Sequence, residues 1–286
     1  MCRREVTNMA DIDFMGRGLT CDYGVRFLIV DITSAAQIAF ERHQLEKGSG
    51  KICAEGMLAS MLMASQIKGD ERITMNMQNE IPIFQFMCDI TAQGDIRAKI
   101  TPSTISMENR LKGVFVSIKH NKKKELYRGV TEIDSESLEK GILHHLQQST
   151  QVLCDLKIVI IQDEEGQILR ALGLLLEKMP VESLGVTAEV FEEYIKPLSS
   201  LSPREVIDQI DARMLLGHEL EIMDQRTLQW KCRCSQKRVE SMLVSLGKGQ
   251  LIEILEEDKQ AQITCEYCNQ KYTVDEATLK EIIGRL

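Results

Sequence analysis

Four cysteines near the end of the chain have the residue type and the spacing of a metal site. Cys232 and Cys234 are separated by one residue and Cys265 and Cys268 by two, with 30 residues between the pairs. Four soft thiolates suit a tetrahedral zinc ion. We therefore expect Cys232, Cys234, Cys265 and Cys268 to hold one zinc ion while they are reduced.

The residues around these cysteines favour a compact module. Between the pairs, Ser235 can cap a helix that ends at Gly247. Nearby basic residues would offset part of the negative charge of a four-thiolate site and favour thiolate over thiol: Lys231, Arg233, Lys237, Arg238 and Lys271. The sequence thus predicts a small C-terminal zinc-binding domain over residues 230–286.

The residues leave two uses of this module open. An inert structural zinc site is the commoner use of four cysteines at such spacings. A redox switch is favoured by the first pair, because cysteines one residue apart lie roughly 7 Å apart in extended chain, beyond the preferred separation for a disulfide. A bridge between Cys232 and Cys234 would be strained, and strained disulfides are easily reduced.

Length, composition and charge exclude several classes of protein. The chain has 286 residues, of which 43% are hydrophobic and 27% charged, which is typical of a folded globular protein. A formal charge of −8 opposes binding to nucleic acid. The sequence shows neither a signal-like apolar start nor an apolar run long enough for a membrane, so we expect a cytoplasmic location. No set of acid, base and nucleophile can be assembled, so we expect no enzymatic activity.

The hydrophobic periodicity predicts an α+β fold for the first domain, residues 1–179. Its expected strands, where apolar residues alternate with polar ones, lie at 73–77, 96–100 and 114–118, and a hairpin is expected over 152–176. Its expected helices lie at 34–43, with Ser34 as cap and Gln37 completing a capping box, at 52–67 and at 135–148.

The segment 180–229 differs from its neighbours in composition. It carries ten acidic and four basic residues, a formal charge of −6, and it contains a helix start at Ser202, Pro203 and Glu205. Its apolar residues indicate amphipathic helices that must pack against a neighbour, because a few helices without a core of their own are marginally stable. We predict a metastable helical linker.

The cysteine segments resemble those of the redox-regulated 33-kDa heat-shock chaperones. The residues that carry this resemblance are Trp-Lys-Cys-Arg-Cys-Ser at 230–235 and Cys-Glu-Tyr-Cys-Asn-Gln-Lys-Tyr at 265–272. Two further matches are Asp-Tyr-Gly-Val-Arg at 22–26 and the Met-Pro step at 179–180. The resemblance extends over most of the chain.

The resemblance implies an ATP-independent holdase for unfolding client proteins under oxidative and heat stress. Such a chaperone is inactive when reduced and zinc-bound. It becomes active, and tends to form a homodimer, when disulfides Cys232–Cys234 and Cys265–Cys268 form and zinc is released. The alternative is a static zinc-binding adaptor without redox regulation, and retention of zinc under mild oxidation and heat would identify it.

Overall fold

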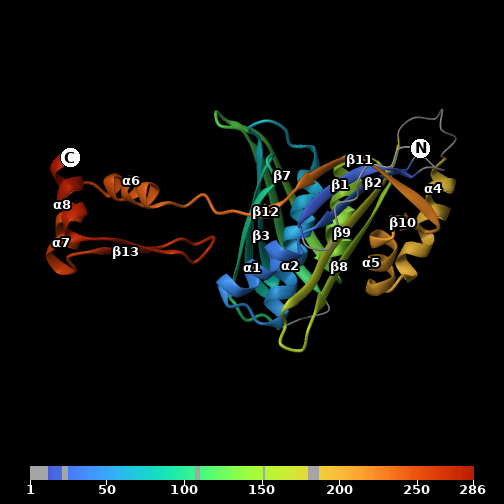
Figure 1. Cartoon of the computed structure of the whole chain (residues 1–286), viewed down its shortest axis with the longest axis horizontal. Helices are drawn as coiled ribbons and strands as arrows, with labels where there is room; N and C mark the ends of the chain where they lie inside the picture. Colours follow the sequence, from blue (N-terminus) through green and yellow to red (C-terminus); the bar gives the residue numbers. More distant parts are fainter. Residues whose placement is uncertain (1–11, 21–24, 107–109, 151, 180–186) are drawn as a thin grey trace. The chain divides into compact units, whose positions relative to one another are not determined.

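The chain folds into two compact units, which are described separately. A computed structural model describes residues 12–20, 25–106, 110–150, 152–179 and 187–286. The N-terminal unit extends to Trp230 and the C-terminal unit covers Lys231–Leu286 (Figure 1). Of the segments that carry the resemblance, residues 22–24 and Pro180 lie outside the described residues.

The first sheet of the N-terminal unit is antiparallel throughout and has the order β10-β11-β1-β2-β9-β8. Its strands are β1 (Phe14–Thr20), β2 (Val25–Asp31), β8 (Cys154–Gln162), β9 (Ile168–Lys178), β10 (Met214–Leu215) and β11 (His218–Thr227). The hairpin expected over 152–176 is confirmed as β8 and β9. We did not predict β1 and β2 as strands.

The second sheet has the order β12-β5-β4-β3-β6-β7. Its strands are β3 (Arg72–Ile81), β4 (Ile83–Thr91), β5 (Asp95–Thr101), β6 (Leu111–His120), β7 (Glu125–Ser135) and the two-residue β12 (Gln229–Trp230), which runs parallel to β5. All three strands predicted from period-two alternation are confirmed as parts of β3, β5 and β6. In β3, Ile73, Met75 and Met77 are buried because every second side chain faces the helices.

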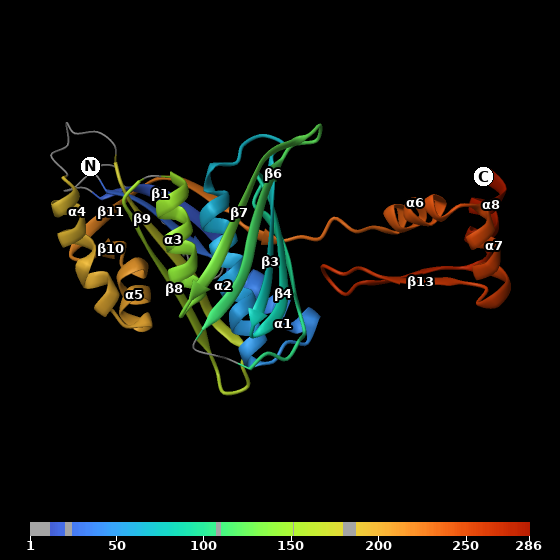
Figure 2. The ribbon, with the colours of Figure 1, turned by 180° about the vertical axis from the view of Figure 1, so that it is seen from behind.

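Helices fill the space between the two sheets, as Figure 2 shows from behind. They are α1 (Thr33–His43), α2 (Lys47–Met63), which continues as a short 3-10 helix (Ala64–Gln66), and α3 (Leu138–Thr150). Twelve residues of α2 are buried. The core around α2 includes side chains of both sheets, such as Phe86 of β4 and Leu175 of β9. A helix apolar on nearly every face is therefore explained by packing on two sides.

The start of α1 corrects one prediction. No side chain of the residue before the helix caps it, and Ser34 lies within its first turn. Asp13 instead accepts hydrogen bonds from the backbone N–H groups of Ser34, at 2.8 Å, and Ala35, at 2.7 Å. Asp31 also accepts the Thr33 N–H at 3.0 Å, so part of the cap is local, but the Asp13 contacts lie 21 residues away in sequence and leave no local signal. The predicted capping box of Ser34 and Gln37 was therefore wrong.

The other face of the first sheet is covered by α4 (Ala188–Ile195), a 3-10 helix η4 (Lys196–Ser200) and α5 (Pro203–Asp211). Phe191, Leu198 and Val206 are buried there. They pack with side chains from the central strands of the sheet, among them Phe27, Leu174 and Leu176. Strands β2 and β9 are thus buried on both faces. The predicted capping box of α5 is present, with Ser202 and Glu205 bonded reciprocally.

The segment predicted as a helical linker is helical only as far as Asp211. Residues 214–227 form β10 and β11, in which Leu220 is buried while Glu219 and Glu221 are exposed. This period-two alternation is the signal of a strand, and it was overlooked because the acidic composition extends without a break from the helices before it. The apolar side chains of α4, η4 and α5 pack against the first sheet and form no separate core of their own. The boundaries of a separate linker stay a prediction.

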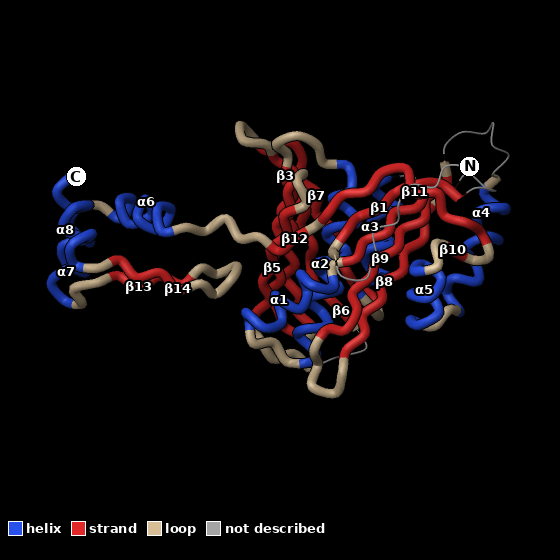
Figure 3. Tube along the Cα trace, in the orientation of Figure 1, coloured by secondary structure: helices blue, strands red, loops and turns tan. Residues whose placement is uncertain are grey.

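The C-terminal unit consists of three helices and one hairpin, coloured by type in Figure 3. They are α6 (Gln236–Leu246), α7 (Lys248–Glu257), β13 (Ala261–Thr264), β14 (Lys271–Val274) and α8 (Glu276–Arg285). The helix predicted after Ser235 is confirmed as α6. The core is small and consists of seven buried apolar side chains: Val239, Leu243, Leu251, Ala261, Val274, Leu279 and Ile282.

Candidate metal centre

Cys232 and Cys234 lie in the extended segment between β12 and α6. Ser235 ends this segment as the cap of α6, since its Oγ accepts a hydrogen bond from the Arg238 N–H at 3.3 Å. The Arg238 guanidinium reaches back and donates to the carbonyl oxygen of Arg233 at 2.7 Å. The residue between the two cysteines is thereby fixed to the first turn of α6, which orients both thiols.

Cys265 and Cys268 lie in the turn between β13 and β14. The N–H of Asn269 donates to the Cys265 carbonyl at 2.8 Å, and the Cys265 N–H donates to the Gln270 carbonyl at 2.9 Å. Asn269 adopts the left-handed conformation with φ of 52°, which asparagine tolerates well. This tight turn directs both thiols of the pair to one side.

The structure brings the four sulfur atoms together as the sequence predicts. All four Sγ atoms lie within 4.8 Å of one another. The Cys232 and Cys265 sulfurs are 3.6 Å apart, and the Cys234 and Cys268 sulfurs 3.4 Å. In a tetrahedral site with Zn–S bonds of about 2.3 Å, the sulfurs would be about 3.8 Å apart. The cluster can therefore bind a metal ion of this size with small adjustments.

The surroundings of the sulfurs differ. Cys268 is buried, and the other three cysteines are half-buried. Burial raises the pKa values of the Cys265 and Cys268 thiols. The basic residues expected to favour thiolate therefore do not lower these two pKa values, so a metal ion must displace their protons when it binds.

One side chain outside the four cysteines contacts the cluster in a specific way. The hydroxyl of Tyr272, at the second position of β14, donates a hydrogen bond to Cys234 Sγ over 3.0 Å. This bond joins the segment before α6 to the hairpin. Sequence reasoning missed it, because Tyr272 is 38 residues away from Cys234. Hydrogen bonds to the ligands of a metal orient them and tune the site.

The remaining described cysteines do not join this cluster. Cys53, Cys88 and Cys154 are buried in the N-terminal unit. Burial raises the pKa of Cys53 and that of Cys154 to about 12. Such thiols are poor nucleophiles and act as small apolar side chains.

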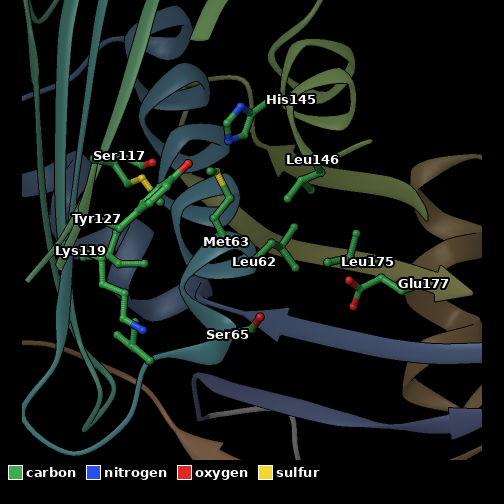
Figure 4. Close-up of a pocket in the computed structure, with 13 residues that line it drawn as sticks. Leu62, Met63, Ser65, Ser117, Lys119, Tyr127, His145, Leu146, Leu175 and Glu177 are labelled. Atoms are coloured by element: carbon green, nitrogen blue, oxygen red, sulfur yellow. The ribbon is translucent and has the colours of Figure 1, made fainter. Parts of the chain in front are cut away.

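The N-terminal unit contains a hollow of about 210 Å³ that involves α2, α3 and both sheets (Figure 4). Two of its polar side chains are already engaged by neighbouring groups. The Lys119 ammonium lies 2.9 Å from Glu71, and the His145 ring is hydrogen-bonded to Thr131. The hollow is therefore a partly apolar depression. Among its described residues we find no nucleophile hydrogen-bonded to a base.

None of the helices in the described part of the chain combines the length and the apolar character needed to span a bilayer.

Comparisons with known proteins agree on one family. A model described as Hsp33 protein matches residues 13–275. A 33 kDa chaperonin from Bacillus cytotoxicus is 26% identical over 295 residues, covering 96% of this chain and 99% of the relative. A 33 kDa chaperonin from Bacillus cereus is 25% identical over 290 residues, with the same coverage.

The fold has a counterpart among solved structures. The crystal structure of a 33 kDa chaperonin from Thermotoga maritima matches with a TM-score of 0.82 and 17% sequence identity. The match covers 96% of this chain and 98% of the other. At this level of identity the likeness establishes the α+β fold.

Proposed function

This chain belongs to the Hsp33 protein family, and from that membership we propose that it is a chaperone of the holdase type that oxidation switches on. The observation that carries the proposal is the gathering of four cysteine sulfurs within 4.8 Å. In the reduced protein, Cys232, Cys234, Cys265 and Cys268 would hold one zinc ion. The bound ion would keep the C-terminal unit folded and the chaperone inactive.

Oxidation by a hydroperoxide would remove the zinc ligands. Each pair of thiolates gives two electrons to one hydroperoxide, and the O–O bond of the hydroperoxide breaks. The two sulfurs form a disulfide, and the two oxygens take up two protons and leave as water and an alcohol, or as two waters when the oxidant is hydrogen peroxide. Zinc leaves as the divalent ion. The pairs Cys232–Cys234 and Cys265–Cys268 are proposed from the family resemblance, since all four sulfurs are mutually close.

Loss of the metal should unfold the C-terminal unit. Structural zinc contributes about 10–16 kcal/mol in small thiolate modules, whereas a whole domain has about 5–15 kcal/mol of net stability. A core of seven buried apolar side chains is small for a unit of 56 residues. The metal term therefore dominates the stability of this unit.

The end of the N-terminal unit offers a path from metal loss to exposed apolar surface. The Leu228 N–H donates to the Asp13 carbonyl at 2.8 Å, and the Gln229 N–H to the Gly94 carbonyl at 3.0 Å. Cys232 follows Trp230 after one residue. Detachment of this end would loosen β11 and then the helices that cover the first sheet. The apolar face of the sheet beneath these helices would become exposed and could hold unfolding clients.

Light scattering of a denaturing client tests the proposal. Reduced zinc-loaded protein should leave aggregation unchanged, and the same protein after peroxide treatment at elevated temperature should suppress it. Equal activity in both states would reject regulation by oxidation. A zinc-binding dye, read in parallel, distinguishes the redox-regulated chaperone, which would release its metal, from the static adaptor, which would retain it.

We further propose that the protein acts in the cytoplasm, independently of nucleic acid and membranes, and that the oxidised form is a homodimer.

A further inference from the structure

The strand β11 occupies a long edge of the first sheet. It pairs antiparallel with β1 along the whole of β1, from Phe14 opposite Thr227 to Thr20 opposite Leu220. Among the strands that the structure describes, only the two-residue β10 lies beyond β11, so β1 would become the edge of this sheet if β11 left. The four strands β1, β2, β9 and β8 are paired in this order and would still form a continuous sheet.

The side chains of β11 contribute little to its attachment. Of its ten residues only Leu220 is buried, and Met223 is 68% exposed. The ion pair between Arg17 and Asp224 spans 2.7 Å, but both side chains are more than 40% exposed, so it adds little stability. The backbone ladder is therefore the main attachment of β11 to β1.

One glycine in β1, Gly18, makes room for this close backbone contact. A Cβ atom on Gly18 would lie 1.8 Å from the carbonyl oxygen of Glu221 in β11. A Cβ on Gly16 would meet its nearest neighbour, the ring of Phe14, at an ordinary 3.6 Å. The edge of β1 is thus shaped to accept a neighbouring main chain, and Gly18 is the position where the approach is tightest.

We propose that this edge of β1 is a client-binding site, which β11 fills in the resting protein and an extended segment of an unfolding client fills after activation. The inference rests on the proposed function, because β11 must first be released. A client would add as an antiparallel strand and replace the hydrogen bonds that β11 gives up.

This mode of binding suits a chaperone that must hold many different sequences. Strand addition takes its affinity from main-chain hydrogen bonds, which every extended polypeptide can make except at proline. The apolar face of the sheet uncovered beside the edge would then take apolar side chains of the client. A client strand paired with β1 also prevents β11 from pairing there, so client binding and the resting arrangement are mutually exclusive.

Hydrogen exchange measured by mass spectrometry tests the inference on the full chain. In the reduced zinc-loaded protein, both β1 and β11 should be protected. After peroxide treatment β11 should exchange rapidly, and so should those amides of β1 that face β11, whereas the amides of β1 that are bonded to β2 stay protected. Addition of a denaturing client should restore protection to the β1 amides that face β11 by about tenfold or more, while residues 218–227 remain unprotected.

Other outcomes of this experiment overturn the inference in distinguishable ways. If peroxide leaves β11 protected, the proposed release fails and the client site fails with it. If β11 opens and clients bind but the β1 amides that face β11 stay unprotected, only the client site is wrong. Protection of these amides in the oxidised protein before any client is added, with β11 open, would show that a second copy fills the edge instead, which also overturns the inference.

A pair of variants provides a matched control. Gly18→Ala places a methyl group against the backbone of any strand paired there, and also 2.8 Å from the buried Phe27 ring of β2. In a variant whose β2 keeps the exchange protection of the parent protein, we expect the oxidised form to lose at least fivefold in client capture. Gly16→Ala adds the same methyl group where space allows it, and should hold clients like the parent protein. Equal capture by the two oxidised variants would contradict the inference. Exchange protection of α2 in the same samples shows whether each variant is folded.

A peptide competitor provides a readout that does not depend on any variant folding. A synthetic peptide with the sequence of residues 218–227 should bind the oxidised protein and reduce client capture by about half or more at saturation. The same peptide with proline in place of Glu221 and Met223 cannot complete the ladder and should leave capture unchanged. Equal competition by both peptides would overturn the inference.

Discussion

The hydrogen bond from Tyr272 to Cys234 leads to a prediction about the metal site. Tyr272→Phe removes the hydroxyl group and leaves the ring in place. The lost contact is a 3.0 Å bond to a sulfur that carries charge when it binds metal. Hydrogen bonds to charged groups contribute about 1.5–3 kcal/mol, and loss of such a partner of a metal ligand typically lowers affinity about 10–100-fold.

We therefore expect Tyr272→Phe to weaken zinc binding at least about tenfold. Competition between the protein and a chromophoric chelator measures this directly and needs no client. Cobalt-loaded protein provides a second readout. A thiolate that has lost its hydrogen bond donates charge more readily, so the sulfur-to-cobalt charge-transfer band should shift to longer wavelength.

Ser245→Ala is the matched control, because it removes a hydroxyl group of the same unit that is bonded within α6, to the Met242 carbonyl at 2.6 Å, and leaves the bond between Tyr272 and Cys234 intact. Its zinc affinity and cobalt spectrum should stay close to those of the parent protein. The reasoning is refuted if Tyr272→Phe is folded and binds zinc as tightly as the parent, with an unshifted cobalt band.

Three further predictions concern stability. Removal of the metal by a chelator from the reduced protein should abolish the helical circular dichroism of the C-terminal unit, and an unchanged spectrum would contradict the dominant role of zinc. Ser202→Ala should lower the stability of α5 by about 1 kcal/mol, seen as faster hydrogen exchange of its amides, whereas Ser199→Ala, which removes a hydroxyl bonded within η4, should have little effect there. Burial raises the pKa of Glu55 from 4.5 to about 7, so stability is lost as the pH rises through this window. Glu55→Gln should therefore stabilise the N-terminal unit by about 1–3 kcal/mol at pH 8 and have no effect at pH 4, and an equal gain at both pH values in denaturant titrations would exclude this cause.

The sequence predicts the elements that carry a local signal. The strands β3, β5 and β6 were found because one face of each is buried and the other is wet, which produces alternation. The cap of α5 was found because Ser202 and Glu205 are neighbours in the sequence. The four cysteines were identified as a set by residue type and spacing, and the geometry of their sulfurs agrees.

What the sequence did not predict depends on contacts between distant segments. Strand β2 is buried on both faces, so its apolar run shows no alternation that would distinguish a strand from a helix. Asp13 caps α1 across 22 residues, and Tyr272 reaches Cys234 across 38. Such pairings are set by the tertiary fold, and a single sequence does not encode them in any local pattern.

The position of Trp230 has a practical consequence. It is the single tryptophan of the chain, it stands in β12, and its ring centroid lies 6.5 Å from that of His43 in an edge-on contact. Only Lys231 separates it from the first cysteine of the metal site. Its intrinsic fluorescence is therefore a built-in optical probe for the junction of the two units, and stopped-flow recording could time the departure of β12 from β5 without any attached dye.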